Sequence, residues 1–143
     1  MKILLAVDGS DHSDHATSKL IELVGRFREP PHIHVLTVHQ PVVHLGITGM
    51  VLTDAMLDEF YQEEGKKALD SAVRMLQKAG LIFATHIEVG SVAQAIVEKA
   101  REIDADYVYM GTRGKTALSN ALLGSVVTRV LHLAHGIPVI LVQ

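Results

Sequence analysis

Four residues near the C-terminal end of the chain have the types and spacing of a phosphate-binding site. Two residues separate Gly111 from Gly114, and after nine more residues Gly124 is followed by Ser125. Glycine lets backbone N–H groups approach an anion because it has no Cβ. A helix N-terminus adds unpaired N–H donors and a partial positive charge. A helix beginning near Gly124 would therefore complete a cradle for phosphate groups.

The same glycines also fit a simpler interpretation, in which they provide a tight exit from a strand and a small residue for helix packing. Two features favour phosphate binding. The segment 115–123 is longer than the roughly two to six residues that usually join a strand to the next helix. This region also carries side chains that can reach phosphate oxygens, namely Arg113, Lys115, Thr116, Ser119 and Asn120.

Two widespread phosphate-binding motifs do not match. Gly114-Lys115-Thr116 resembles the end of a P-loop, but Tyr109 stands where that motif requires its first glycine. A dinucleotide-binding G-x-G-x-x-G pattern is absent from the sequence. The glycine pattern therefore indicates a different kind of phosphate site.

Asp8 is the second candidate for chemistry, because it follows the apolar run 3–7 directly. A carboxylate at the end of a central strand can accept hydrogen bonds from ribose hydroxyls or hold magnesium through water. The alternative is that Asp8 caps the next helix or closes a turn. Both interpretations stay open at the level of sequence.

The histidines do not favour a metal site. His32 and His34 share a predicted strand face, and His132 and His135 share a predicted helix face. No third ligand accompanies either pair at a recognisable spacing. The second pair fits better as positive charge near a helix C-terminus. No arrangement of residues identifies a catalytic nucleophile.

Short apolar runs alternate with segments of helical periodicity, which predicts a parallel sheet with helices on both faces. The predicted strands are 3–7, 33–38, 83–89, 106–110 and 139–142. The predicted helices run from the turn at 8–11 to Phe27, from Thr53 to Ala79, from Ser91 to about Ile103, and from Leu122 to His135. Ligands of such sheets bind beyond the carboxyl ends of the strands, where the strand order reverses. If the first and fourth strands are neighbours there, Asp8 and Gly111 face one crevice.

Two local patterns refine the helices. Ser91 and Gln94 have the spacing of a capping box at the start of the third helix. Residues at helical spacing in the second helix predict its buried face, namely Met56, Leu57, Phe60, Leu69, Ala72, Val73 and Leu76.

Length and composition predict one soluble domain over residues 1–143. The net charge of −3 argues against nucleic acid as a partner. No apolar run approaches the length of a membrane-spanning helix. The chain has no cysteine, so it has no disulfides or thiolate chemistry. We expect a cytoplasmic protein.

At this point the chain resembles the universal stress protein family over its whole length. The segment 104–114 is similar to the family's most distinctive stretch, and G-x2-G-x9-G-[ST] marks the ATP-binding branch. Gly111, Gly114, Gly124 and Ser125 meet that pattern at every position. The resemblance implies an α/β, Rossmann-like fold with a five-stranded parallel sheet in the order 3-2-1-4-5. Many members have glycine near position 117, where this chain has Ala117.

The resemblance also implies which residues bind the nucleotide. The glycines and Ser125 would approach the ribose and phosphates, Asp8 would lie against the nucleotide, and Val38 would offer backbone groups to the adenine. The predicted nucleotide-binding set is Ala6, Val7, Asp8, Val38, Met110, Gly111, Arg113, Gly114, Gly124, Ser125 and Val126. The expected ligand is ATP, or ADP or AMP, with magnesium held weakly by Asp8.

The resemblance further implies a homodimer through the apolar strand Val139–Val142, whose exposed edge would otherwise invite pairing. The favoured function is an ATP-dependent regulatory module in the stress response, acting on an unknown protein partner. Two alternatives are a slow ATP-hydrolysing or phosphate-transferring enzyme and a dimeric interaction protein that does not use nucleotide.

Overall fold

The computed structural model describes residues 1–42, 53–115 and 123–143. Its elements follow in the order β1 (Lys2–Ala6), α1 (Asp11–Val24), β2 (His32–His39), α2 (Asp54–Lys78), β3 (Phe83–Val89), α3 (Val92–Glu102), β4 (Tyr107–Gly111), α4 (Ser125–Leu133) and β5 (Val139–Val142). The strands pair in parallel in the order β3-β2-β1-β4-β5. The predicted fold class, strand number and strand order are confirmed.

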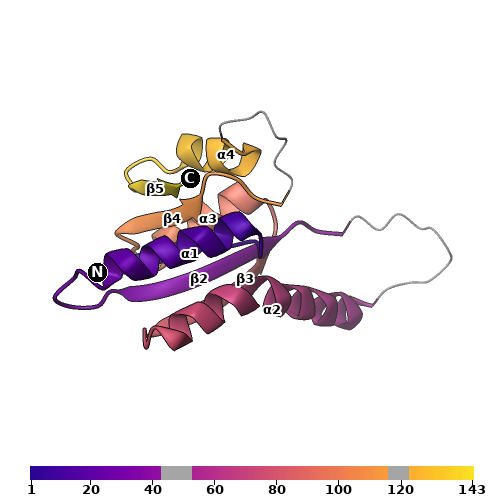
Figure 1. Cartoon of the computed structure of the whole chain (residues 1–143). Coiled ribbons are helices and arrows are strands. Elements are labelled where there is room, and N and C mark those ends of the chain that lie inside the picture. Colours follow the sequence, from indigo (N-terminus) through magenta and orange to yellow (C-terminus); the bar gives the residue numbers. More distant parts are fainter. Residues whose placement is uncertain (43–52, 116–122) are drawn as a thin grey trace.

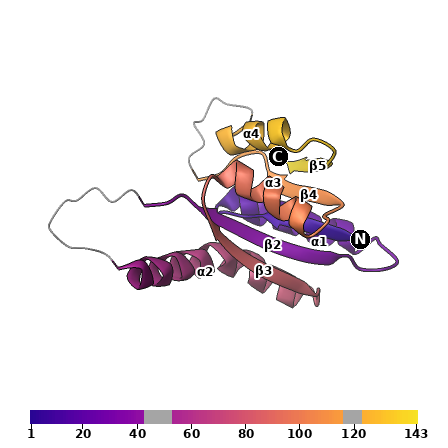
Figure 2. The same ribbon diagram turned by 180° about the vertical axis from the view of Figure 1, so that it is seen from behind.

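Helices cover both faces of the sheet, with α1 and α2 on one side and α3 and α4 on the other (Figures 1 and 2). Strand β1 lies in the middle and is buried on both sides. Ile3 and Leu5 pack toward α1 and α2, whereas Leu4 and Ala6 pack toward α3 and α4. A strand covered on both faces needs a continuous apolar run, and this is the pattern the sequence shows.

Helix α1 is shorter than predicted. The Ser10 hydroxyl accepts a hydrogen bond from the Ser13 amide and so caps its start. The helix ends at Val24 and not at Phe27, whose side chain is exposed. The amides of Arg26 and Phe27 bond to carbonyls three residues back, and this tighter turn ends the α-helix.

Helix α2 begins at the predicted cap, where Thr53 accepts from the Met56 amide. Its predicted apolar face is wrong in the first turns, because Met56 and Phe60 are 45% and 47% exposed. The physical reason is that these turns extend past the carboxyl ends of the strands (Figure 1). The residues that α2 buries come later, namely Gly65, Ala68, Leu69, Ala72 and Leu76.

The predicted capping box of α3 is wrong. Ser91 precedes the helix but its side chain makes no capping hydrogen bond. The Gln94 amide donates instead to Glu98, one turn further on. The predicted start of the last helix at Leu122 lies outside the described residues, and α4 runs from Ser125 to Leu133. Across the described parts of the chain, no helix is long and apolar enough to cross a membrane.

Two histidines meet across the outer strands of the sheet. The rings of His34 on β2 and His86 on β3 stack with centroids 5.2 Å apart, and His34 Nδ1 lies 3.0 Å from His86 Nε2. A hydrogen bond between these nitrogens requires at least one neutral ring. Burial lowers the pKa of both histidines, and positive charge from Lys99 lowers both pKa values further.

This pair predicts that acid destabilises the fold. Because both pKa values are lower in the folded chain than the ordinary 6.5, the unfolded chain takes up more protons as the pH falls below that value. The stabilisation is complete above pH 6.5 and is lost on acidification below it. Urea denaturation of the parent should give a lower free energy of unfolding at pH 5.5 than at pH 7.5. This drop should shrink in His86→Phe and persist in His15→Phe, whose parent residue is exposed on α1. An unchanged drop in His86→Phe would contradict the prediction.

Candidate functional site

A cavity of about 650 Å³ opens at the carboxyl ends of β1, β2 and β4. Strand β1 pairs with β4 on one side. The chain that follows β1 crosses to β2 on the other side, and only later returns to form β4. The cavity therefore occupies the point where the strand order reverses, which is the usual ligand position in such sheets.

Every residue of the predicted nucleotide-binding set lines this cavity. The ends of three strands and the start of α4 bring these residues together: Ala6, Val7, Asp8, Val38, Met110, Gly111, Arg113, Gly114, Gly124, Ser125 and Val126. The residues lie far apart in the sequence, so their convergence depends on the pairing of β1 with both β2 and β4.

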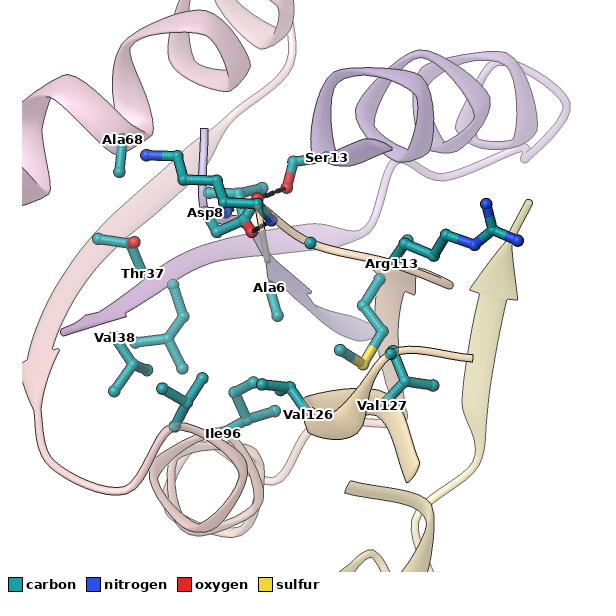
Figure 3. A pocket seen from close by; sticks show the side chains of 18 of the residues that line it. Ala6, Asp8, Ser13, Thr37, Val38, Ala68, Ile96, Arg113, Val126 and Val127 are labelled. Atoms are coloured by element: carbon teal, nitrogen blue, oxygen red, sulfur yellow. Dashed lines mark hydrogen bonds between the residues drawn. The ribbon is translucent and has the colours of Figure 1, made fainter. Parts of the chain in front are cut away.

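The cavity has one apolar wall and one polar wall (Figure 3). The apolar wall belongs to the α3 and α4 side of the sheet and consists of Val38, Val92, Ile96, Met110, Val126 and Val127. The polar wall includes Asp8, Ser13, Thr37, His39 and Lys115. Such a division suits a ligand with a flat apolar part and a hydrophilic part.

The Asp8 carboxylate connects the start of α1 to the loop after β4. Its Oδ1 accepts from the Ser13 hydroxyl at 2.7 Å and from the Ser10 amide at 3.0 Å. Its Oδ2 accepts from the Lys115 amide at 2.8 Å. Burial raises the pKa of Asp8, but these hydrogen bonds outweigh burial and lower the pKa below its ordinary value of 3.8. Asp8 is thus a carboxylate at neutral pH, and it closes the turn as well as lining the cavity.

Two of the motif glycines are required by the packing of the chain itself. A Cβ at Gly114 would lie 2.5 Å from Asp8 Oδ2, and a Cβ at Gly111 would lie 2.9 Å from the His12 carbonyl oxygen. Both distances are too short for real contacts. At Gly124, however, the nearest atoms to such a Cβ are 3.5 Å away, on Arg113 and Thr112. Among the described residues, nothing therefore lies too close for a Cβ at Gly124.

Gly124 is the N-cap of α4, and Ser125 is its first residue. The first N–H groups of any α-helix have no partner within the helix. Gly124, Ser125 and Val126 line the cavity, so this helix start offers backbone donors to a ligand. The Gly124 amide itself donates to the Thr112 carbonyl at 2.8 Å, which holds the helix start against the end of β4.

Two cations, Arg113 and Lys115, also line the cavity. Arg113 and Lys115 form no ion pair with any described residue. Lys115 Nζ lies 3.6 Å from the place where a Cβ on Gly9 would stand. The Arg113 side chain extends away from Asp8, toward the outside (Figure 3). The predicted contributors Thr116, Ser119 and Asn120, like residues 43–52, lie outside the described residues.

Sequence reasoning missed part of the polar wall. Thr37 and His39 flank Val38 on β2, and Ser13 lies in the first turn of α1. The alternation of side chains along a strand predicts from the sequence that Thr37 and His39 lie on the face opposite Val38. No cluster of three or more potential metal-ligating side chains occurs in residues 1–42, 53–115 and 123–143.

The close approach at Gly114 makes a direct prediction. In Gly114→Ala the new methyl group must displace either the Asp8 carboxylate or the loop, so the Lys115 hydrogen bond is strained or lost. We expect a loss of about 1–3 kcal/mol in the free energy of unfolding, as for other overpacked sites. Urea denaturation measures it, with Gly124→Ala as the matched control, for which we expect little change. Equal stability of the two variants would show that the loop does not depend on Asp8.

Sequence comparison relates the whole chain to known proteins. The model of the universal stress protein family matches residues 1–143. A universal stress protein of Methanocaldococcus jannaschii, MJ0531, is 38% identical over 143 residues, which is 99% of this chain and 81% of that protein.

Structural comparison agrees with the sequence. MJ0577, a protein solved to assign its biochemical function from structure, superposes with a TM-score of 0.77 at 24% identity, covering 99% of this chain and 94% of that one. The universal stress protein of Archaeoglobus fulgidus, solved in complex with dAMP, gives a TM-score of 0.63 at 25% identity and covers 100% and 98% of the two chains. Two more distant structures were solved with cAMP and, in Arabidopsis thaliana, with AMP, with TM-scores of 0.70 and 0.64. The match of the family model from end to end shows that this chain belongs to the universal stress protein family.

Proposed function

We propose that the cavity binds an adenine nucleotide, with ATP as the resident ligand, and that this protein is a nucleotide-dependent regulatory module of the stress response. The observation that carries the proposal is the glycine at position 124. No atom of the described residues lies closer than 3.5 Å to a Cβ built there, yet the position lines the cavity at the N-terminus of α4. A phosphate group in that space accounts for the absence of a side chain.

The relatives support an adenine nucleotide in particular. The Archaeoglobus protein was solved with dAMP, and others of the same fold were solved with AMP and cAMP. The two walls of the cavity suit the same class of ligand. The apolar wall suits a base, and the backbone donors at the start of α4 suit phosphate groups.

In this arrangement the base lies at the end of β2, where Val38 offers backbone groups and its side chain joins the apolar wall. Ala6 and Val7 lie between the base and Asp8, which faces the ribose. The phosphates lie against Gly114, Gly124, Ser125 and the Val126 amide. Met110 and Gly111, at the end of β4, line the cavity between the base and the phosphates.

Magnesium would be bound through water at Asp8, whose carboxylate already accepts three hydrogen bonds. Ordering of the segments around the cavity by ATP and magnesium would then alter a surface that a protein partner recognises. Such a switch requires that the ligand bind one state more tightly than the other.

Calorimetric titration of nucleotide-free protein tests the proposal. We expect ATP to bind with a dissociation constant near 1 µM, equivalent to about −8 kcal/mol, and magnesium to strengthen binding. Gly124→Leu should bind at least about 100-fold more weakly, because its side chain would occupy the phosphate position. Gly25→Leu, a surface glycine with ordinary clearance at the end of α1, is the matched control. Unimpaired binding by Gly124→Leu would contradict the placement of the phosphates, and absence of binding by the parent would contradict the function.

We also propose that two chains dimerise through β5. This strand lies at one edge of the sheet, and its residues are all only partly buried. The carbonyls of Pro138 and Val142 accept hydrogen bonds from β4. Because hydrogen bonding alternates along a strand, Val139 and Leu141 present their backbone groups to the free edge, where another β5 can pair.

A proline at the free edge tests the dimer. Leu141→Pro removes one outward N–H without removing a bond to β4, so we expect it to weaken or abolish dimerisation. Sedimentation equilibrium should give the parent twice the chain mass of 15.6 kDa and the variant a mass close to that of a monomer. Leu141→Ala, which keeps the N–H, should remain dimeric. A parent that sediments as a monomer would contradict the proposal.

A further inference from the structure

The first half of α2, residues 54–64, combines exposed apolar side chains with a high density of negative charge. Met56 and Phe60 are large and apolar, yet each is nearly half exposed. The segment contains no lysine or arginine. Its acidic residues are Asp54, Asp58, Glu59, Glu63 and Glu64. These five negative charges exceed the net charge of −3 of the whole chain, so this end of α2 is a strongly acidic part of the molecule.

The two apolar side chains lie on the outer side of the helix. Met56 and Phe60 stand one turn apart and therefore share one side of α2. About two and a half turns separate Met56 from the buried Gly65, and the same interval separates Phe60 from the buried Leu69. Residues half a turn out of phase lie on opposite sides of a helix. Packing of α2 on the sheet therefore does not account for Met56 and Phe60.

Interactions within the described residues leave most of the negative charge without a counterpart. Glu64 pairs with Lys67 at 2.7 Å. The ion pairs of the described residues do not involve Glu59 or Glu63. A helix N-terminus favours acidic residues only within its first turn, and Asp54 is the acidic residue that lies there. The helix dipole therefore does not explain the carboxylates further along.

Two of these carboxylates border the apolar pair. Glu59 follows Met56 by three positions, and Glu63 follows Phe60 by the same interval, so the members of each pair are neighbours on the helix surface. The outer side of α2 thus presents an apolar strip with carboxylates along one edge. We call these four residues, Met56, Glu59, Phe60 and Glu63, the docking face.

The docking face lies close to the cavity. The Phe60 ring meets the Tyr61 ring edge-on, with centroids 5.7 Å apart, and the Tyr61 ring lies 6.5 Å from that of His39. The Tyr61 hydroxyl accepts a hydrogen bond of 2.7 Å from the Val42 amide, just after β2. His39 lines the cavity, so two successive ring contacts connect the docking face with the proposed nucleotide site.

We infer that the docking face binds a basic amphipathic helix of a partner protein, which places apolar side chains on Met56 and Phe60 and lysine or arginine beside Glu59 and Glu63. A helix suits this face because its own side chains recur at the spacing of one turn. The negative charge disfavours nucleic acid and anionic lipid, and a second copy that docked through the same face would set like charges against each other. This inference rests on the proposed regulatory function, to which it adds the chemistry of the partner.

Fluorescence anisotropy with a labelled peptide tests the inference in the full chain without nucleotide. The probe is a helical peptide of leucine and lysine with its leucines on one side, and the control peptide has glutamate in place of lysine. We expect the parent to bind the lysine peptide and not the glutamate peptide, and added salt to weaken binding. Phe60→Ser should weaken it about fivefold, as for other truncated interface residues. Glu59→Lys should weaken it about threefold, because exposed charge pairs contribute less.

Phe27→Ser and Glu98→Lys are the matched controls, since they make the same changes at exposed positions just after α1 and on α3. Both should bind the peptide as the parent does. Absence of peptide binding by the parent, or binding that Phe60→Ser and Glu59→Lys leave unchanged, would overturn the inference. Self-association of the parent that Phe60→Ser abolishes would also overturn it, by assigning the face to a second copy. A parent that binds the peptide but no ATP would instead overturn the proposed function, so the two failures are distinguishable.

Discussion

The pairing of β1 with β4 is the constraint on which the rest of the site depends. The register aligns Ala6 with Met110, so the chain leaves both strands at the same level of the sheet. The Asp8 carboxylate, just after β1, accepts a hydrogen bond from the Lys115 amide in the loop after β4. This hydrogen bond links segments more than a hundred residues apart in sequence and sets where the loop after β4 begins. The cavity lies beside this hydrogen bond, and Asp8 and Lys115 both line it.

The glycines of the motif divide into two physical roles. Gly111 and Gly114 are small because the backbone of α1 and the Asp8 carboxylate lie where a Cβ would stand. At Gly124 no described residue lies that close, and the residue lines the cavity. The simpler interpretation of the pattern, turn and packing chemistry, therefore accounts for two of its glycines, and the proposed phosphate contact would account for the third. A motif of this kind combines a requirement of the fold with a requirement of the site.

The charged groups of the cavity act on one another across the sheet. Lys115 belongs to the loop after β4, yet its positive charge also lowers the pKa of His39 at the end of β2, where burial is the larger cause. The Asp8 carboxylate accepts three hydrogen bonds, which stabilise its negative charge. Buried carboxylates are tolerated when their oxygens are paired in this way.

The sequence by itself determined the alternation of strands and helices, because burial on both faces demands apolar runs and helices demand a longer period. It also identified the glycines and Asp8, since their types and spacing are local properties. It failed at Met56 and Phe60, where helical periodicity continues although the helix has passed the end of the sheet, and at Ser91, where a local cap competes with a pairing of Gln94 and Glu98. The folded chain alone reveals which glycines are required by packing and that, within the described residues, the buried Nε2 of His39 has no hydrogen-bond partner. These two features depend on distances between residues that are far apart in the sequence and are brought together by strand pairing. A local sequence pattern does not contain such distances.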